Sequence, residues 1–216
     1  MRSHRLRTHR SPAAAQQGAA LFVTLCIVVV LMLLAASMVR TALNAERSAR
    51  GERDRQIALQ GAEAALQDAE HDIEGGADPA SKRAAMFADG SAEGFVQGCG
   101  AGQDNPELGL CLRSLEPAPA AWQSVALAGG AEGEGSGSIR TVEYGRFTGA
   151  AMPYGRGALP ARLPRYIIEL MPYARAGHDA GRRTQNFYRI TAIGFGATES
   201  TRVVLQAFYL KAGANA

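Results

Sequence analysis

The chain has 216 residues, of which 47% are hydrophobic, and it carries a formal net charge of +3. This length fits one compact domain beside a membrane segment rather than two domains. The charge is unevenly distributed, because residues 1–18 contain four arginines and no acid (Arg2, Arg5, Arg7 and Arg10). Without these residues the net charge falls from +3 to −1, which argues against a general nucleic-acid-binding surface.

An uninterrupted apolar segment follows the basic residues, from Gly18 to Val39. It contains no charged residue, and its only hydroxyl-bearing side chains are Thr24 and Ser37. As a helix it would be about 33 Å long, close to the hydrocarbon thickness of a bilayer. Positive charge next to a lone span tends to stay in the cytoplasm. We therefore predict a basic cytoplasmic segment (1–18), a single transmembrane helix (19–39) and a C-terminal part on the other side of the membrane.

The helix is expected to continue through residues 40–74, because no proline occurs between Pro12 and Pro79. In its second half, small and apolar residues recur at three- and four-residue spacing, which predicts one buried face: Ile57, Gly61, Ala62, Ala65, Leu66, Ala69 and Ile73. The opposite face carries polar residues and is expected to be solvated: Glu63, Gln67, Asp68, Glu70 and Glu74. We expect the helix to be weakest at Gly51 and to end at Gly75-Gly76.

Residues 75–137 form a variable region with little periodicity. Asp78-Pro79 is typical of an N-cap followed by proline at the first helical position, so a short helix is expected over 79–88. From Gly90 to Gly137 glycine, proline and alanine prevail, which is typical of a binding loop or of a segment without packed structure. Trp122, the only tryptophan, is expected to pack a satellite cluster onto the sheet, and a surface anchor is the alternative.

Two of the three cysteines lie in the variable region and one in the apolar segment. Cys26, in the apolar segment, is expected to behave as a small apolar side chain. Cys99 and Cys111 are on the expected exported side, which is oxidising in a bacterial envelope protein. Because the loop between them is short and glycine-rich, we predict a Cys99–Cys111 disulfide, with two unpaired thiols as the alternative.

Strand signals dominate residues 138–216. β-Branched and aromatic residues gather in four runs: Ile139–Phe147, Tyr166–Leu170, Phe187–Ile193 and Arg202–Leu210. The last two runs are joined by a connection that contains Gly194-x-Gly196, which indicates a hairpin turn and not a phosphate-binding loop. Successive strands after one long helix predict an α+β fold, in which an antiparallel sheet packs on the helix face from Ile57 to Ile73.

No arrangement typical of an enzyme is visible in the sequence. The four histidines are scattered along the chain: His4, His9, His71 and His178. A metal site requires clustered ligands at defined spacing, and the single candidate, Asp68-His71-Asp72, is more simply interpreted as a solvated helix face. The sequence contains no Gly-x-Ser-x-Gly nucleophile motif. We therefore expect no catalysis, no metal and no cofactor.

Three segments of the chain resemble a known family. A glycine precedes the apolar run in Gln16-Gln17-Gly18-Ala19-Ala20-Leu21, Arg53–Leu66 reads RDRQIALQGAEAAL, and Tyr188–Gly196 reads YRITAIGFG. These segments resemble the type IV pilin class, and most closely its PilX-type minor pilins, over residues 16–74 and 187–210. The resemblance implies a type IV pilin-like fold and a prepilin peptidase that cuts between Gly18 and Ala19.

The resemblance also implies a structural subunit of type IV pilus assembly, with contributions to adhesion or twitching motility. Its implied partners are other minor and major pilins through the N-terminal helix, the prepilin peptidase, the inner membrane and the pilus assembly platform. No nucleic acid is expected as a partner.

One residue of this chain departs from the pattern of major pilins. In major pilins the fifth mature residue is a glutamate, which pairs with the N-terminal amine of the subunit ahead of it. Counted from Ala19, the fifth residue here is Val23, and no acid occurs before Glu46. An unpaired charge among apolar helices is costly. Val23 therefore indicates a subunit with nothing ahead of it, at the pilus tip or in an initiation complex.

Three alternatives stay open on the sequence. A minor pseudopilin of a type II secretion system would have the same helix. A tip adhesin or DNA-binding module would use the loops from Gly90 to Gly137, or a local basic patch of Arg162, Arg165 and Arg175. A signal-anchored envelope protein would keep residues 1–18 throughout its life.

Overall fold

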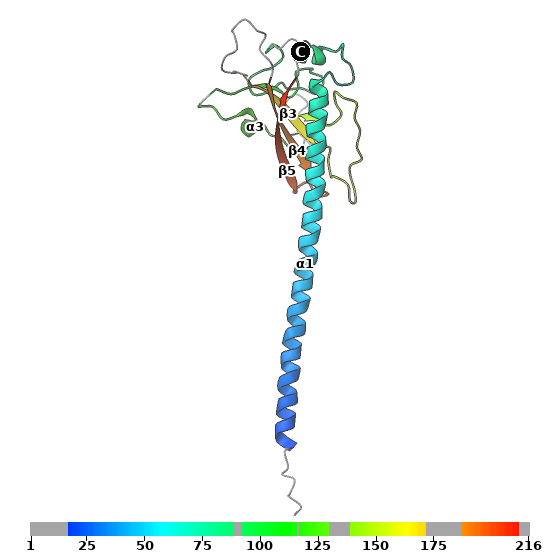
Figure 1. The fold of residues 1–216 in the computed structure, drawn as a ribbon, viewed down its shortest axis with the longest axis vertical. Coiled ribbons are helices and arrows are strands. Elements are labelled where there is room, and N and C mark those ends of the chain that lie inside the picture. The colour runs from blue at the N-terminus through cyan, green and yellow to red at the C-terminus, as the bar shows by residue number, and fades with distance from the viewer. Residues whose placement is uncertain (1–16, 89–91, 116, 130–138, 172–186, 212–216) are drawn as a thin grey trace, which may run out of the picture. The chain divides into compact units, whose positions relative to one another are not determined.

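The computed structural model describes residues 17–88, 92–115, 117–129, 139–171 and 187–211. The leader up to residue 16 therefore lies outside the described residues. In chain order the elements are α1 (Gln17–Ile73), α2 (Lys82–Ala88), β1 (Leu110–Leu112), α3 (Ala121–Ser124), β2 (Val142–Glu143), β3 (Arg165–Met171), β4 (Phe187–Phe195) and β5 (Arg202–Leu210) (Figure 1). The chain divides into two compact units, Met1–Arg50 and Gly51–Ala216.

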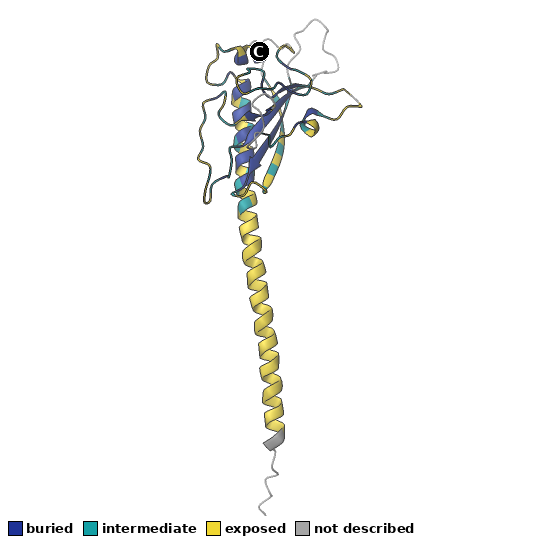
Figure 2. Cartoon of the chain, turned by 180° about the vertical axis from the view of Figure 1, so that it is seen from behind, coloured by how far each residue is buried: buried dark blue, intermediate teal, exposed yellow. Residues whose placement is uncertain are grey.

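In the first unit, α1 is exposed from Ala19 onward. Every residue from Ala19 to Arg50 is exposed, as the uniform colouring of this part of α1 in Figure 2 shows. The residues from Ala19 to Val39 are aliphatic, small or aromatic, without a charge among them. The continuous helix agrees with the absence of proline from this segment.

In the second unit, α1 buries one face against the sheet (Figure 2). The fully buried residues of this face follow the three- and four-residue spacing of the sequence: Ala58, Ala62, Ala65, Ala69 and Ile73. The predicted apolar face is thus confirmed, with Ile57 and Leu66 partly buried at its margins. After Ile73 the chain turns through Gly75 and Gly76, both with positive φ, and the Gly76 amide donates to the His71 carbonyl (2.9 Å).

The sheet has the order β1-β3-β4-β5, and β2 pairs with β3 beside this path. The β3–β4 and β4–β5 pairs are antiparallel, as predicted, and β3 pairs with β4 from Arg165↔Ile193 to Met171↔Phe187. β1, however, pairs with β3 in parallel, with Leu110 opposite Ile168. The sheet is therefore mixed, and the α+β class stands.

β1 lies in the region from Gly90 to Gly137, which the sequence predicts to be a binding loop or a segment without packed structure. Its three residues are too few to produce a period-two pattern, and its neighbours hold it in place. The carbonyl of Leu110 accepts a hydrogen bond from the Gly100 amide (3.0 Å), and the Leu112 amide donates to Val96 (2.9 Å). The strand predicted over Ile139–Phe147 is conversely short, because the Arg146 amide donates to the Glu143 carbonyl and turns the chain after two paired residues.

α2 begins at Lys82 rather than at Pro79. The Asp78 carboxylate accepts a hydrogen bond from the Ala80 amide (2.9 Å) and closes a turn, so it does not cap a helix. The Ser81 hydroxyl accepts the bond from the Ala84 amide (3.1 Å) that an N-cap residue receives. The capping residue is therefore three positions later than predicted.

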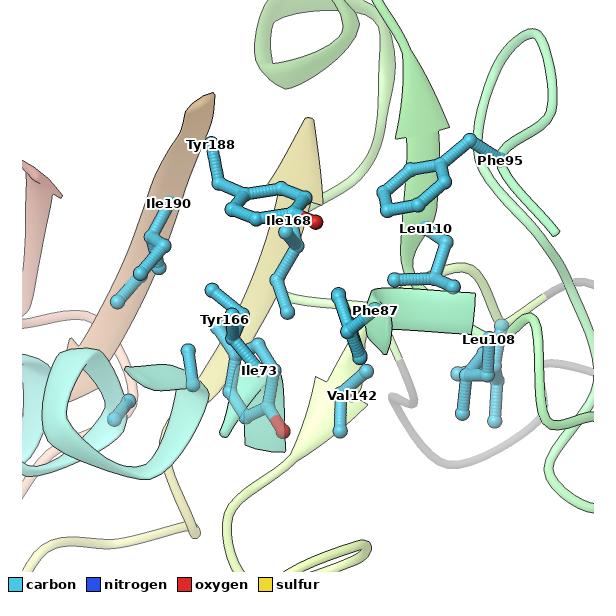
Figure 3. Packing of buried hydrophobic residues seen from close by; sticks show 14 residues of the cluster. Ile73, Phe87, Phe95, Leu108, Leu110, Val142, Tyr166, Ile168, Tyr188 and Ile190 are labelled. Carbon is cyan, nitrogen blue, oxygen red and sulfur yellow. The ribbon is translucent and has the colours of Figure 1, made fainter. Parts of the chain in front are cut away.

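The main core lies between α1 and the sheet. Figure 3 shows side chains from α1, α2 and the strands converging there, with Tyr166 and Ile168 of β3 beside Ile73 and Phe87. The alternate residue Ile167 points to the other face, into a second cluster. That cluster consists of Cys99, Cys111, Ala121, Val125 and Ile167, with Trp122 and Leu127 packed against it. The predicted satellite cluster around Trp122 is confirmed.

Candidate assembly helix and the contacts that fasten it

The predicted processing site lies at the start of α1. Gly18 and Ala19 belong to the first turn of the helix, and Val23 follows one turn later with 53% of its surface exposed. Leu21 and Phe22 are more exposed still, at 75% and 68%. The N-terminal helix surface is thus apolar and open, and Val23 offers no carboxylate to a neighbouring amine.

The polar side chains of this segment satisfy themselves within the helix. The Thr24 hydroxyl donates to the Leu21 carbonyl (2.8 Å), and the Ser37 hydroxyl donates to the Leu34 carbonyl (2.7 Å). Hydroxyls paired in this way lose little when water is removed. Among the described residues, α1 is the one helix long and apolar enough to cross a membrane. The whole surface from Ala19 to Val39 can therefore enter lipid or pack among other apolar helices.

Asp54 lies near the start of the α1 segment that packs on the sheet, and it binds the connection between β4 and β5. Its carboxylate accepts hydrogen bonds from the amides of Ala197 and Thr198 and from the Thr198 hydroxyl (2.8 Å for the last). Hydrogen bonding from Thr201, together with Thr198 and these amides, lowers the pKa of Asp54 although burial acts in the opposite direction. The connection between β4 and β5 is thus held by an ionised side chain of α1.

One to two turns further along α1, the backbone of the helix comes close to the backbone of β4. A Cβ atom at Gly194 would lie 2.0 Å from the Ala58 carbonyl oxygen and 2.4 Å from the Ala62 nitrogen. Gly61 on α1 faces the same place, where its Cβ would lie 3.6 Å from the Gly194 Cα. Gly194 therefore has a packing role inside β4, beyond the turn that the sequence predicts. Only glycine leaves room for the helix at this position.

Near the end of α1, a buried ion pair joins the helix to α2. Arg83 donates through Nη2 to Asp72 Oδ2 (2.6 Å), and the side chains of both residues are at most 4% exposed. The Tyr166 hydroxyl donates to the same carboxylate oxygen (3.0 Å). Arg83 Nη1 donates to the carbonyls of Pro106 (2.7 Å) and Leu108 (2.8 Å), so the guanidinium connects α1, α2 and the loop before β1. Such fully bonded pairs are costly to break.

Asp68, one turn earlier, binds the loop after β2. It accepts hydrogen bonds from the Thr148 hydroxyl and from the Gly145 amide (2.8 Å for the latter). Burial raises the pKa of Asp68, and these two hydrogen bonds act in the opposite direction. The carboxylate therefore ties α1 to a loop 77 residues away along the chain.

The prediction of a solvated Asp68-His71-Asp72 face is correct only for His71, which is exposed. Asp68 and Asp72 are instead buried. The Thr148 hydroxyl donates a hydrogen bond to Asp68, and Asp72 pairs with Arg83 and accepts a hydrogen bond from the Tyr166 hydroxyl. A signal was present: both acids stand three residues after an alanine of the buried face, Ala65 and Ala69. No group of three metal-binding side chains gathers in the part of the chain that the structure describes. His178 and Arg175 lie outside it.

On the opposite face of the sheet, the disulfide predicted between Cys99 and Cys111 is formed, with the two Cα atoms 4.0 Å apart. Both cysteines are buried beneath α3 in the second cluster. Glu169 of β3 also lies there, and it pairs with Arg189 (2.8 Å) and accepts a bond from the Ala121 amide (3.2 Å). Arg162 and Arg165 each have an acidic partner, Glu199 and Glu143, which balances their positive charge locally.

These features define a class of protein. A long helix that is apolar and exposed at its start, and packed through small residues on a largely antiparallel sheet at its end, is the architecture of type IV pilin-like proteins. The comparisons with protein families agree: the PilX N-terminal model matches residues 17–67. The model of the C-terminal part of the type IV pilus assembly protein PilX matches residues 89–211.

The second match alone covers more than half of the chain, and the chain belongs to the PilX family of type IV pilus assembly proteins. No curated protein and no solved structure matches the chain significantly. Membership gives it a minor-pilin role in the type IV pilus, as a structural component that interacts with other pilus components.

Proposed function

We propose that this minor pilin is cut between Gly18 and Ala19 and then joins the pilus through the N-terminal part of α1. The observation that carries the proposal is the exposed surface from Ala19 to Val39, which contains no charge and no unsatisfied hydroxyl. A bilayer and a filament core both require such a surface, because each lacks water to solvate polar groups. The helix would thus pass from one to the other without a change in its own structure.

The orientation follows from the charges on either side of the span. Four arginines precede it, so residues 1–18 would face the cytoplasm and the sheet would lie in the periplasm. In that position the prepilin peptidase meets the Gly18–Ala19 bond on the cytoplasmic side. The pilus assembly platform and the other pilins meet the mature helix within the inner membrane.

Val23 supports a place at the tip or in the initiation complex. A subunit that joins behind another must neutralise the N-terminal amine ahead of it, and Val23 cannot do so. A first subunit has no such task. The match to a type IV pilus assembly family favours the pilus over a secretion pseudopilus. Adhesion and twitching motility would then depend on this subunit through pilus initiation.

The N-terminus of the protein from its own cells tests the processing step. Intact-mass analysis is expected to show a chain that begins at Ala19, and Gly18→Trp is expected to leave the leader attached. Gln17→Ala serves as the control, because it changes the neighbouring residue without filling the glycine position. A native chain that still carries Arg2 would contradict the proposal.

Position in the filament is tested by labelling the mature protein in sheared pili. We expect label at one end only, at a small fraction of the number of major subunits. Val23→Glu supplies the missing carboxylate and is expected to allow label along the shaft. Regular label along the shaft in the unmodified protein would contradict the tip position.

A further inference from the structure

The helix surface just beyond the apolar segment carries arginines that no described residue neutralises. Arg40 follows Val39 directly, and Arg47 lies seven residues further along α1. Both are exposed, and neither forms an ion pair or hydrogen bond within the described part of the chain. Arg50 differs, because Glu46 pairs with it one turn earlier. Two unpaired positive charges thus remain next to the apolar segment.

Arg40 and Arg47 lie on the same side of the helix. Seven residues make nearly two full turns, so Arg40 and Arg47 lie one above the other, about 10 Å apart along the axis. Helical side chains lean toward the N-terminus of their helix. The long arginine stem can therefore carry each guanidinium back toward the apolar segment.

The depth of the two groups matches the headgroup layer of a bilayer. If the segment from Ala19 to Val39 fills the hydrocarbon core, the polar layer covers the next 5–8 Å or so. Arg40 lies where the hydrocarbon core meets the headgroup layer. Arg47 lies just beyond the headgroup layer, and its side chain can reach back to the boundary between that layer and water. Arg55, also exposed and without a partner among the described residues, comes about four turns after Arg40 and is too far along α1 to reach.

We infer that Arg40 and Arg47 bind the phosphate of an anionic phospholipid headgroup in the leaflet on the exported side, and so hold the subunit at a fixed depth before assembly. The inference rests on the insertion and orientation proposed above. Guanidinium groups offer paired donors that match phosphate oxygens. Arginines beside a span on its exported side otherwise oppose the usual charge rule, and a bound anion removes that conflict.

The test uses the full chain in vesicles of phosphatidylcholine that contain spin-labelled phosphatidylglycerol or spin-labelled phosphatidylcholine. The unmodified protein is expected to immobilise the phosphatidylglycerol label preferentially. Arg40→Gln and Arg47→Gln are each expected to lower that preference roughly fivefold. The matched control is Arg55→Gln, which removes the same charge further along the helix and is expected to keep the preference.

Several results would overturn the inference. One is a preference unchanged in Arg40→Gln and Arg47→Gln, and another is an equal loss in Arg55→Gln, which would indicate a general charge effect. Displacement of the lipid label by millimolar glycerol phosphate would indicate a soluble phosphate ligand instead. Loss of a cross-linked acidic subunit from the two variants, with lipid preference intact, would assign the arginines to a protein partner.

Alkaline carbonate extraction of the same vesicles separates this inference from the proposed function. Protein that stays in the membrane but shows no lipid preference overturns the headgroup site alone. Protein that washes out of the membrane contradicts the insertion on which the proposed function also depends.

Discussion

The two parts of α1 both present apolar surface, but they differ in the size of their side chains and in whether the chain itself covers them. Between Ala19 and Val39 the surface consists mainly of aliphatic side chains, and all of it is exposed. After Gly51 the buried face consists largely of alanine, at 0% exposure from Ala58 to Ala69. The first part needs partners outside the chain, whereas the second has its own. Small residues let the sheet come close enough for Gly194 to contact the helix backbone.

The comparison teaches that side-chain size separates the two kinds of surface. Large aliphatic residues serve a helix that has to fit changing surroundings, because they bury much area without demanding one geometry. Alanine and glycine serve a fixed interface, because their small volume fits only a partner that approaches closely. Changes in the second part should therefore alter stability, and changes in the first should leave it unaltered.

The largest effect is expected from Asp72→Ala. The change leaves Arg83 buried without its carboxylate, and breaking such a pair costs about 3–5 kcal/mol. The measurement is the free energy of unfolding of the full chain in detergent, followed through Trp122 fluorescence. Val29→Ala, in the exposed part, is the control and should leave this free energy unaltered. A loss below about 1 kcal/mol in Asp72→Ala would show that the pair is not buried.

The second effect concerns the disulfide. Replacing Cys99 and Cys111 by serine together should lower the free energy of unfolding by about 3 kcal/mol, because a loop of this size is no longer closed in the unfolded chain. The free energy of unfolding is measured by urea titration. Cys26→Ser, in the exposed part of α1, is the control and should leave this free energy unaltered. Two thiols at Cys99 and Cys111 that react with a thiol reagent in unreduced native protein would contradict the bond.

A pair of glycine variants compares a glycine that contacts another element with one that contacts none. Gly194→Ala should destabilise the domain by about 1–3 kcal/mol, since the new methyl group meets the backbone of Ala58 and Ala62. Gly51→Ala meets nothing within 4 Å and should instead stabilise the helix by about 0.5–1 kcal/mol. Thermal unfolding by circular dichroism measures both. Equal shifts in the same direction would contradict the close backbone contact at Gly194.

The smallest effect is a loss of stability at high pH. The Tyr209 hydroxyl donates to Glu74 (2.6 Å), and this bond is the main reason that the pKa of Tyr209 rises from 10.0 to about 12. Because the folded state holds the phenolic proton more tightly, the contribution is complete below pH 10 and is lost as the pH rises toward 12.

Tyr209→Phe should remove this pH dependence and, at neutral pH, cost about 0.5–1 kcal/mol, since the bond is exposed to water. Unfolding titrations at several pH values between 9 and 12 or so compare the variant with the unmodified protein. Tyr154→Phe, at an exposed loop position, is the control. Parallel profiles for Tyr209→Phe and unmodified protein would contradict the role of the bond.

Features that depend on neighbouring residues could be predicted from the sequence. The apolar segment, the alanine face and the β4–β5 hairpin all follow from local periodicity, and each is present in the fold. The disulfide followed from composition and compartment, since Cys99 and Cys111 enclose a short loop. The role in pilus assembly was predicted from the family resemblance, because no single residue of the sheet indicates it.

Features that depend on distant partners could not be predicted. Asp68 and Asp72 lie beside the alanine face in the helical pattern, but nothing in the sequence shows that Thr148, Arg83 and Tyr166 fold onto them. β1 has only three residues and pairs in parallel with a strand that comes more than 50 residues later. The role of Gly194 as a contact point depends on the helix it touches. A turn and a close approach both require glycine, and the sequence contains no mark that separates them.

The close fit between β4 and α1 also sets an order of events during synthesis. The alanine face of α1 is complete at Ile73, whereas β4, which covers part of it, begins more than 100 residues later at Phe187. At about 5–20 residues per second, the ribosome needs at least some 5–20 s to close this gap. Throughout that interval the helix face lacks β4. A face made of alanines exposes little apolar area to chaperones or to other nascent chains. The same small residues that allow tight packing therefore limit non-specific binding during the delay.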